Sequence, residues 1–219
     1  MPVRHALLRS AIRLSLVSLC AVASADAQLP GLPVFQNAFA NPGMTAAVNY
    51  GRARDVTAFA LAGAWAPGSA RFQLSAGIGT VVPDGPAESD LAYGGRVSMA
   101  IRQFGSGRMG VGAFGGIGAA REASLANGIG GLSLGYRRPM GAGGIAAFVS
   151  PYYLYSRQDV GGNSSSSSLV RAGVGVDVSF FKKFGITVGA DLGAKPDVGR
   201  PGPTGSIFGI GVSYAFRTG

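Results

Sequence analysis

Apolar and polar residues alternate with a period of two along most of this chain. In 71–82, "RFQLSAGIGTVV", the large apolar residues hold even positions, while glutamine, serine and glycine hold the odd ones. In 169–181, "LVRAGVGVDVSFF", valine and phenylalanine again alternate with arginine, glycine, aspartate and serine. Successive side chains of a strand point to opposite faces, so each run predicts a strand with one apolar face. Helical spacing explains neither run.

Ten such runs can be marked, and most have the ~9–11 residues that a tilted strand needs to cross a bilayer. The sequence therefore predicts an all-β fold, an antiparallel up-and-down transmembrane β-barrel of ten strands, with eight strands as the alternative. The predicted strands are 45–53, 56–65, 71–82, 91–103, 108–121, 129–137, 144–157, 169–181, 186–193 and 206–217.

The connections between these runs form two sets that alternate along the chain. One set is short and turn-like, such as "FGSG" and "KKFG", and the other is mostly longer and polar, such as "PDGPAESD". Outer-membrane barrels have short periplasmic turns and longer outer loops, so ten strands would place both termini in the periplasm. The run "NSSSSS" at 163–168 is expected to form a flexible outer loop.

The first 27 residues have the pattern of a secretory signal peptide: three arginines, a short apolar stretch and A-x-A sites that end at Ala25 and Ala27. We expect cleavage there, an N-terminal periplasmic or plug segment at 28–44, and a barrel at 45–219. Cleavage removes His5 and Cys20, the only histidine and the only cysteine. The protein is therefore expected in the cell outer membrane, with no imidazole and no thiol.

Charges and aromatic residues support two membrane boundaries. The short-turn ends carry basic residues without acids, as in Arg71, Arg108 and Arg138, and these suit phospholipid head groups. Aromatic residues gather near both ends of the predicted strands, as expected where a barrel meets the two interfaces. They are Trp65, Phe72, Tyr136, Phe180, Tyr214 and Phe216 near the short turns, and Tyr50, Tyr93, Tyr153 and Tyr155 near the longer loops.

The last predicted strand, "GSIFGIGVSYAFRTG", contains Gly211, Tyr214 and Phe216. It resembles the C-terminal β-signal of Gram-negative outer-membrane proteins, in which a glycine precedes two aromatic residues spaced by one. The resemblance implies recognition by the outer-membrane assembly machinery. The final aromatic residue usually closes such a chain, whereas three residues follow Phe216 here. The whole predicted mature chain is similar to small outer-membrane β-barrels as a class.

Two other architectures are weaker alternatives. The longest charge-free stretch, 139–156, is long enough for a membrane helix, but Pro151 and three glycines interrupt it. A soluble exported β-domain would also show alternation.

Two catalytic motifs occur without their required context. Residues 110–115, "GVGAFG", match G-x-G-x-x-G, but a turn precedes them and no acid follows about 20 residues on. "GLSLG" at 131–135 places Ser133 in a nucleophile-elbow pattern, but the predicted mature chain has no histidine to act as base. We therefore expect no enzyme activity, no cofactor and no metal. No basic-aromatic patch suits nucleic acid.

The parity opposite to the apolar one would line the barrel lumen, and most of its residues are Gly, Ala or Ser. On the predicted strand 108–121, Phe114 is the one bulky residue expected to point into the lumen. Side chains can fill an eight-stranded barrel, but more strands widen the interior. Ten strands lined by small residues are therefore expected to leave space in the lumen. Water, a narrow permeant, a lipid-like ligand or segment 28–44 are the candidate occupants.

Five charged residues are predicted to form a lumen charge network: Arg96, Arg102, Arg171, Asp177 and Asp191. Folding the chain about "KKFG" is expected to make Asp177 and Asp191 near cross-strand neighbours, which need a cation beside them. The network can be a structural brace or a selectivity constriction.

The sequence thus indicates a porin-like, non-enzymatic barrel that acts as a narrow channel or a ligand-holding barrel for small or apolar molecules. Its expected partners are outer-membrane lipids, the assembly machinery and a small-molecule permeant. The alternative is a structural or adhesin-like surface-interaction protein with a closed lumen.

Overall fold

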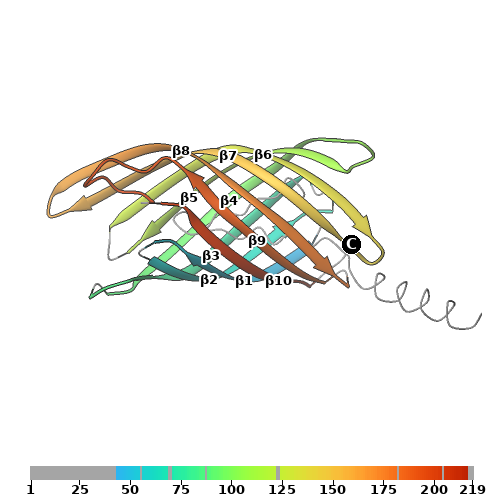
Figure 1. Ribbon diagram of the computed structural model, residues 1–219, viewed down its shortest axis with the longest axis horizontal. Helices are drawn as coiled ribbons and strands as arrows, with labels where there is room; N and C mark the ends of the chain where they lie inside the picture. The colour runs from blue at the N-terminus through green and yellow to red at the C-terminus, as the bar shows by residue number, and fades with distance from the viewer. Residues whose placement is uncertain are drawn as a thin grey trace, which may run out of the picture.

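The computed structural model describes residues 43–216 except 55, 69–70, 87, 122–123, 182 and 204. Its ten strands form one closed antiparallel barrel in which every strand pairs with its neighbours in sequence (Figure 1). This confirms the predicted fold and strand number. The strands are β1 (Gly43–Arg52), β2 (Val56–Ala66), β3 (Phe72–Pro83), β4 (Asp90–Phe104), β5 (Met109–Ala120), β6 (Leu125–Met140), β7 (Gly143–Val160), β8 (Asn163–Phe180), β9 (Phe184–Gly193) and β10 (Ile207–Ala215).

The first and last strands close the barrel. β1 pairs with β10 over eight residue pairs, from Thr45 opposite Ala215 to Arg52 opposite Phe208. The predicted signal peptide lies outside the described residues. So does the segment 28–44, apart from Gly43 and Met44, which begin β1. In the described part of the chain, no helix has the length and apolar character needed to cross a membrane.

The two faces of each strand have the composition that the alternation predicts. In β2, the alanines at 58, 60, 62 and 64 are buried on the inward face, whereas Phe59, Leu61 and Trp65 are exposed on the outward face. The same pattern extends around the barrel, so an apolar outer surface surrounds an inner surface of mostly small residues.

The β7–β8 hairpin corrects the predicted serine-rich loop. β7 continues to Val160, which pairs with Asn163 across a turn of only Gly161 and Gly162. Both glycines have positive φ, 57° and 82°, as a tight two-residue hairpin turn requires. The serines at 164–168 therefore pair with β7 as part of β8. This long hairpin extends to the left in Figure 1.

Glycine on the inward face leaves room for large residues on the neighbouring strand. A Cβ built on Gly131 would lie 2.6 Å from the Tyr152 Cβ, and one on Gly175 would lie 2.6 Å from the Phe148 Cζ. Each of these glycines stands directly opposite the large residue on the neighbouring strand. The same pairing joins Gly116 with Arg96, Gly193 with Arg171 and Gly211 with Asn49.

This arrangement predicts unequal effects for two alanine substitutions in β6. Gly131→Ala should lower the free energy of unfolding by about 1–3 kcal/mol, because the added Cβ overpacks against Tyr152 and the Pro151 carbonyl oxygen. Gly128→Ala is the control, since a Cβ there meets no atom within 4 Å. Urea unfolding in detergent or lipid measures both. Equal effects would contradict the pairing of glycine with large residues.

Candidate functional site

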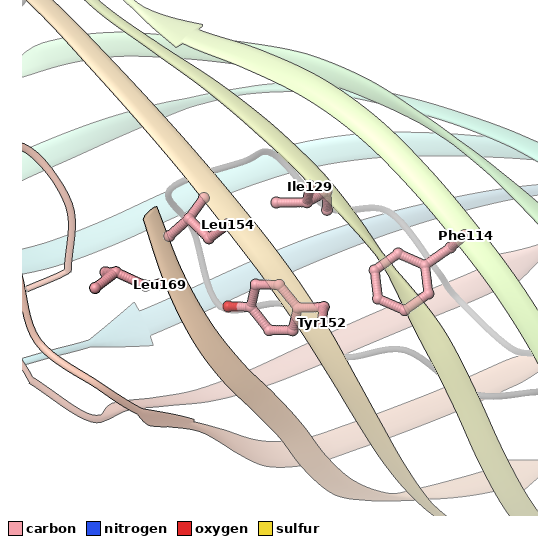
Figure 2. Close-up of a cluster of buried hydrophobic side chains, with 5 residues drawn as sticks. All are labelled: Phe114, Ile129, Tyr152, Leu154 and Leu169. Atoms are coloured by element: carbon pink, nitrogen blue, oxygen red, sulfur yellow. The ribbon is translucent and has the colours of Figure 1, made fainter. Parts of the chain in front are cut away.

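One side of the lumen wall is lined by a cluster of large side chains. Phe114, Ile129, Tyr152, Leu154 and Leu169 come from β5, β6, β7 and β8 and are each no more than 8% exposed (Figure 2). The Phe114 and Tyr152 rings lie 6.3 Å apart, on either side of Gly131. Phe114 is buried on the inward face of β5, and the other members of the cluster come from β6, β7 and β8.

The other side of the lumen wall carries mostly small side chains. On β1, β2 and β3, the inward residues include Ala47, Ala60 and Ala62, and Gly77 and Gly79 stand opposite the last two. On β9 and β10, Gly189 stands opposite Gly209, while Thr187 stands opposite Gly211. The lumen wall is therefore asymmetric, with apolar bulk along β5–β8. The inward residues of β1–β3, β9 and β10 are mostly small, apart from Asn49, Gln73 and Asp191.

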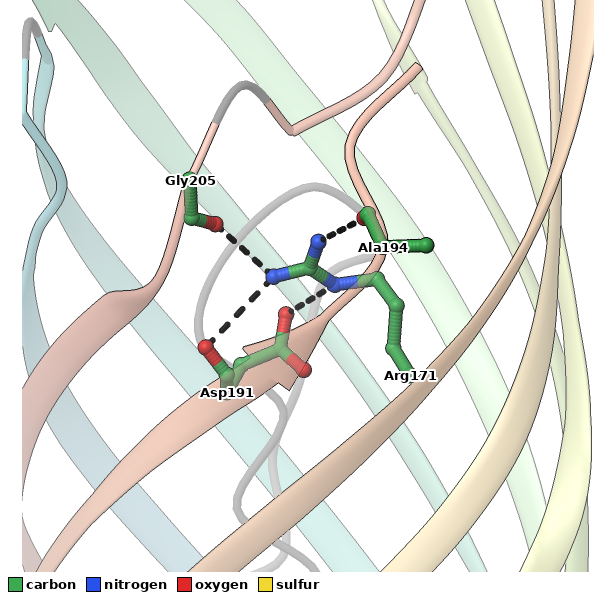
Figure 3. Close-up of polar contacts among 4 residues, drawn as sticks. All are labelled: Arg171, Asp191, Ala194 and Gly205. Atoms are coloured by element: carbon green, nitrogen blue, oxygen red, sulfur yellow. Dashed lines mark hydrogen bonds and ion pairs between the residues drawn. The ribbon is translucent and has the colours of Figure 1, made fainter.

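A buried ion pair marks the end of the lumen where the longer connections lie. Arg171 Nε donates to Asp191 Oδ2 at 2.8 Å, and the side chains are 0% and 2% exposed. The guanidinium also donates to three backbone oxygens, from Nη1 to Ala194 at 2.8 Å and from Nη2 to Gly205 at 2.9 Å and to Asp191 at 3.4 Å (Figure 3). Because Arg171 belongs to β8, it joins β8, the end of β9 and the connection before β10.

The connection at 194–206 packs against inward-facing residues of β8. Ser167 Oγ donates to the Pro201 carbonyl oxygen, and a Cβ on Gly202 would lie 3.3 Å from the Leu169 Cδ1. Arg200 Nη1 donates to the Ser166 carbonyl oxygen at 2.9 Å. Together with the Arg171 contacts, these interactions hold the connection over part of the lumen mouth.

Asp177 does not neighbour Asp191, so that prediction is wrong. Phe180 of β8 pairs with Phe184 of β9. This register places Thr187 opposite Asp177 and Gly173 opposite Asp191. Thr187 Oγ1 donates to Asp177 Oδ1 at 2.6 Å. The two carboxylates face the lumen at different levels and have different partners.

The two β4 arginines lie on opposite faces. Arg96 is 3% exposed and points inward, with its guanidinium carbon 5.7 Å from the centroid of the Phe114 ring. Arg102 is exposed, and its predicted place in the lumen is wrong. A β-bulge between Ala100 and Arg102 places Arg102 opposite the outward-facing Val111. Of the five residues of the predicted network, Arg171 and Asp191 form a direct ion pair.

The residues of the predicted assembly signal lie on and just after β10. Gly211 faces the lumen opposite Asn49, and the ring of Tyr214 lies 5.2 Å from that of Phe216 and 5.0 Å from that of Phe184. These aromatic rings lie at the end of the barrel that carries the short turns.

The two catalytic motifs lie within strands. The G-x-G-x-x-G match belongs to β5, and Ser133 is buried on the inner face of β6, 1% exposed. Within the described ranges, no group of three or more His, Cys, Asp or Glu side chains is placed to hold a metal ion.

Comparison with known proteins gives little beyond this geometry. No protein-family model matches the sequence, and no curated protein matches it. Among solved structures, the N-terminal β-barrel domain of Pseudomonas aeruginosa OprF is similar, with 10% identity and a TM-score of 0.38, covering 80% of this chain and 98% of that one. Identity and TM-score are too low for this likeness to support a conclusion about function.

Breaking the buried ion pair should destabilise the barrel far more than breaking an exposed one. Asp191→Asn leaves the Arg171 guanidinium buried without its counter-charge, so the free energy of unfolding should fall by about 3 kcal/mol. Asp159→Asn is the matched control, because Arg157 and Asp159 are 54% and 56% exposed and the unfolding midpoint should not move. Denaturant unfolding of both variants checks this, and an unchanged midpoint for Asp191→Asn would contradict the bracing role.

Proposed function

We propose that this protein is an integral outer-membrane barrel that acts as a narrow channel for small molecules and has no enzymatic role. The apolar outer surface supports membrane insertion, since side chains such as Leu61, Ile117 and Val170 are 61%, 74% and 68% exposed. The signal-peptide pattern of residues 1–27 supports export. The β-signal residues Gly211, Tyr214 and Phe216 support insertion by the outer-membrane assembly machinery.

The asymmetry of the lumen wall carries the channel proposal. Phe148 lies over Gly175 of the neighbouring strand and so lies along the wall, away from the barrel axis. The opposite wall, with Ala47, Ala60 and Ala62, adds little bulk. A ten-stranded barrel is also wider than the eight-stranded barrels that side chains fill. These three observations support a path beside the alanine and glycine wall.

Arg171 and Asp191 support a constriction at one end of that path. The pair holds the connection 194–206 against β8, so backbone narrows part of the mouth. The two charged side chains are 0% and 2% exposed, so they act by positioning this connection. A narrow point selects among permeants by size, and we infer that the permeant is small.

A non-conducting surface-interaction barrel is the second candidate. The extended β7–β8 hairpin favours it, because this hairpin carries the exposed Ser164 and Ser168 at the loop end of the barrel. Such a protein would bind a surface partner through the hairpin, and its lumen would be closed to ions.

Conductance distinguishes the two candidates. The protein in planar bilayers should give reproducible single-channel steps, and Ala60→Leu should reduce their size, because a larger side chain then enters the path. Gly79 stands opposite Ala60 and leaves room for that side chain, so the fold should be retained. Leu61→Phe, on the outward face of the same strand, is the control and should conduct normally. Absence of steps from the unmodified protein, or equal conductance for Ala60→Leu, would overturn the channel proposal.

A further inference from the structure

The bulge in β4 turns one charged side chain toward the membrane. Without the extra residue between Ala100 and Arg102, Arg102 would share the inward face with Ser98. Bulges commonly redirect a side chain in this way. Two residues before the end of β4, Arg102 is close to the interface, where an arginine on the lipid face costs about 0–1 kcal/mol rather than the 2–4 kcal/mol of the bilayer midplane.

Arg102 adjoins an apolar groove in the outer surface. Its guanidinium carbon lies 4.9 Å from the centroid of the Phe104 ring, and Phe104 forms one edge of the groove. The groove has a volume of about 460 Å³ and runs over β4, β5, β6 and β7. Its lining includes Phe104, Met109, Val111, Leu134, Tyr136 and Ala147.

The floor and rim of this groove differ in size. Ala147 stands opposite Tyr136, and Val111 stands opposite Leu134. The large side chains of Phe104 and Tyr136 therefore rise beside a lower strip formed by Ala147, Val111 and the backbone of Gly110 and Gly135. An extended hydrocarbon chain fits such a strip, because it fills the groove without any polar group.

The charges at the end of the groove all have one sign. Arg138 follows Tyr136 on the same outward face, Arg108 precedes Met109, and both are exposed. The turns at this end, 105–108 and 141–142, contain no acidic residue. An anionic head group at this level would therefore meet Arg102 and its basic neighbours without a competing carboxylate.

We propose that this groove binds one phospholipid of the short-turn leaflet, with an acyl chain along Val111 and Ala147 and the phosphate beside Arg102. The inference requires that the barrel spans a bilayer. It holds whether or not the lumen conducts.

Native mass spectrometry of the detergent-purified protein with added dioleoyl phosphatidylglycerol tests this site. The unmodified protein should retain one lipid. Arg102→Gln should retain it about fivefold less, as expected for loss of one arginine at the membrane surface. Lys183→Gln loses the same charge at the turn between β8 and β9 and is the control. Ala147→Trp should also lose the lipid by filling the groove, whereas Ala172→Trp, outward on β8, should keep it.

Heat-dependent gel mobility confirms that each variant is folded before it is compared. No retained lipid in the unmodified protein would overturn the proposal. Equal loss in Arg102→Gln and Lys183→Gln would overturn it as well, because attraction by overall charge would then suffice. Full retention in Ala147→Trp would show that the groove holds no acyl chain.

Discussion

Hydrogen bonding between β1 and β10 is the constraint on which the rest of this structure depends. A sheet in a bilayer must leave no backbone edge unpaired, and the eight residue pairs between these strands remove the last edge. Once the sheet is closed, each strand has one outward face and one face toward a lumen of limited width. The apolar outer surface, the small inward residues and the placement of all connections at the two ends follow from that closure.

Closure also limits what can point inward, and glycine determines how large side chains are accommodated. Tyr152, Phe148, Arg96 and Arg171 each stand opposite a glycine, and the Phe148 ring lies directly over Gly175 along the wall. The result is a lumen with bulk on one side only. The buried ion pair of Arg171 with Asp191 then closes part of the mouth on that same side, by holding the connection 194–206 in place. Packing and electrostatics thus narrow the lumen on one side, whereas the opposite wall carries mostly alanine and glycine.

Alternation was sufficient to predict the ten strands and which face of most strands is apolar, because both depend only on local parity. It could not predict interactions that depend on register between strands. Asp177 lies opposite Thr187 and not near Asp191, because Phe180 pairs with Phe184. The alternation of residues does not determine this register between β8 and β9. A single extra residue in the β4 bulge moves Arg102 from the predicted lumen to the outer face. The inward cluster had a detectable signal: 148–155, "FVSPYYLY", is apolar at both parities, which indicates a strand packed on both faces.

Water accessibility along β2 tests the open lumen wall most directly. Single cysteines replace residues 58–65 in a chain without Cys20, reconstituted in liposomes, and react with a charged thiol reagent that cannot cross the bilayer. The asymmetric lumen predicts that Ala58, Ala60, Ala62 and Ala64 become reactive positions, while the alternate positions, which face lipid, stay unreactive. Even-numbered cysteines that react only after unfolding would contradict this account, because the alanine wall would then be sealed from water.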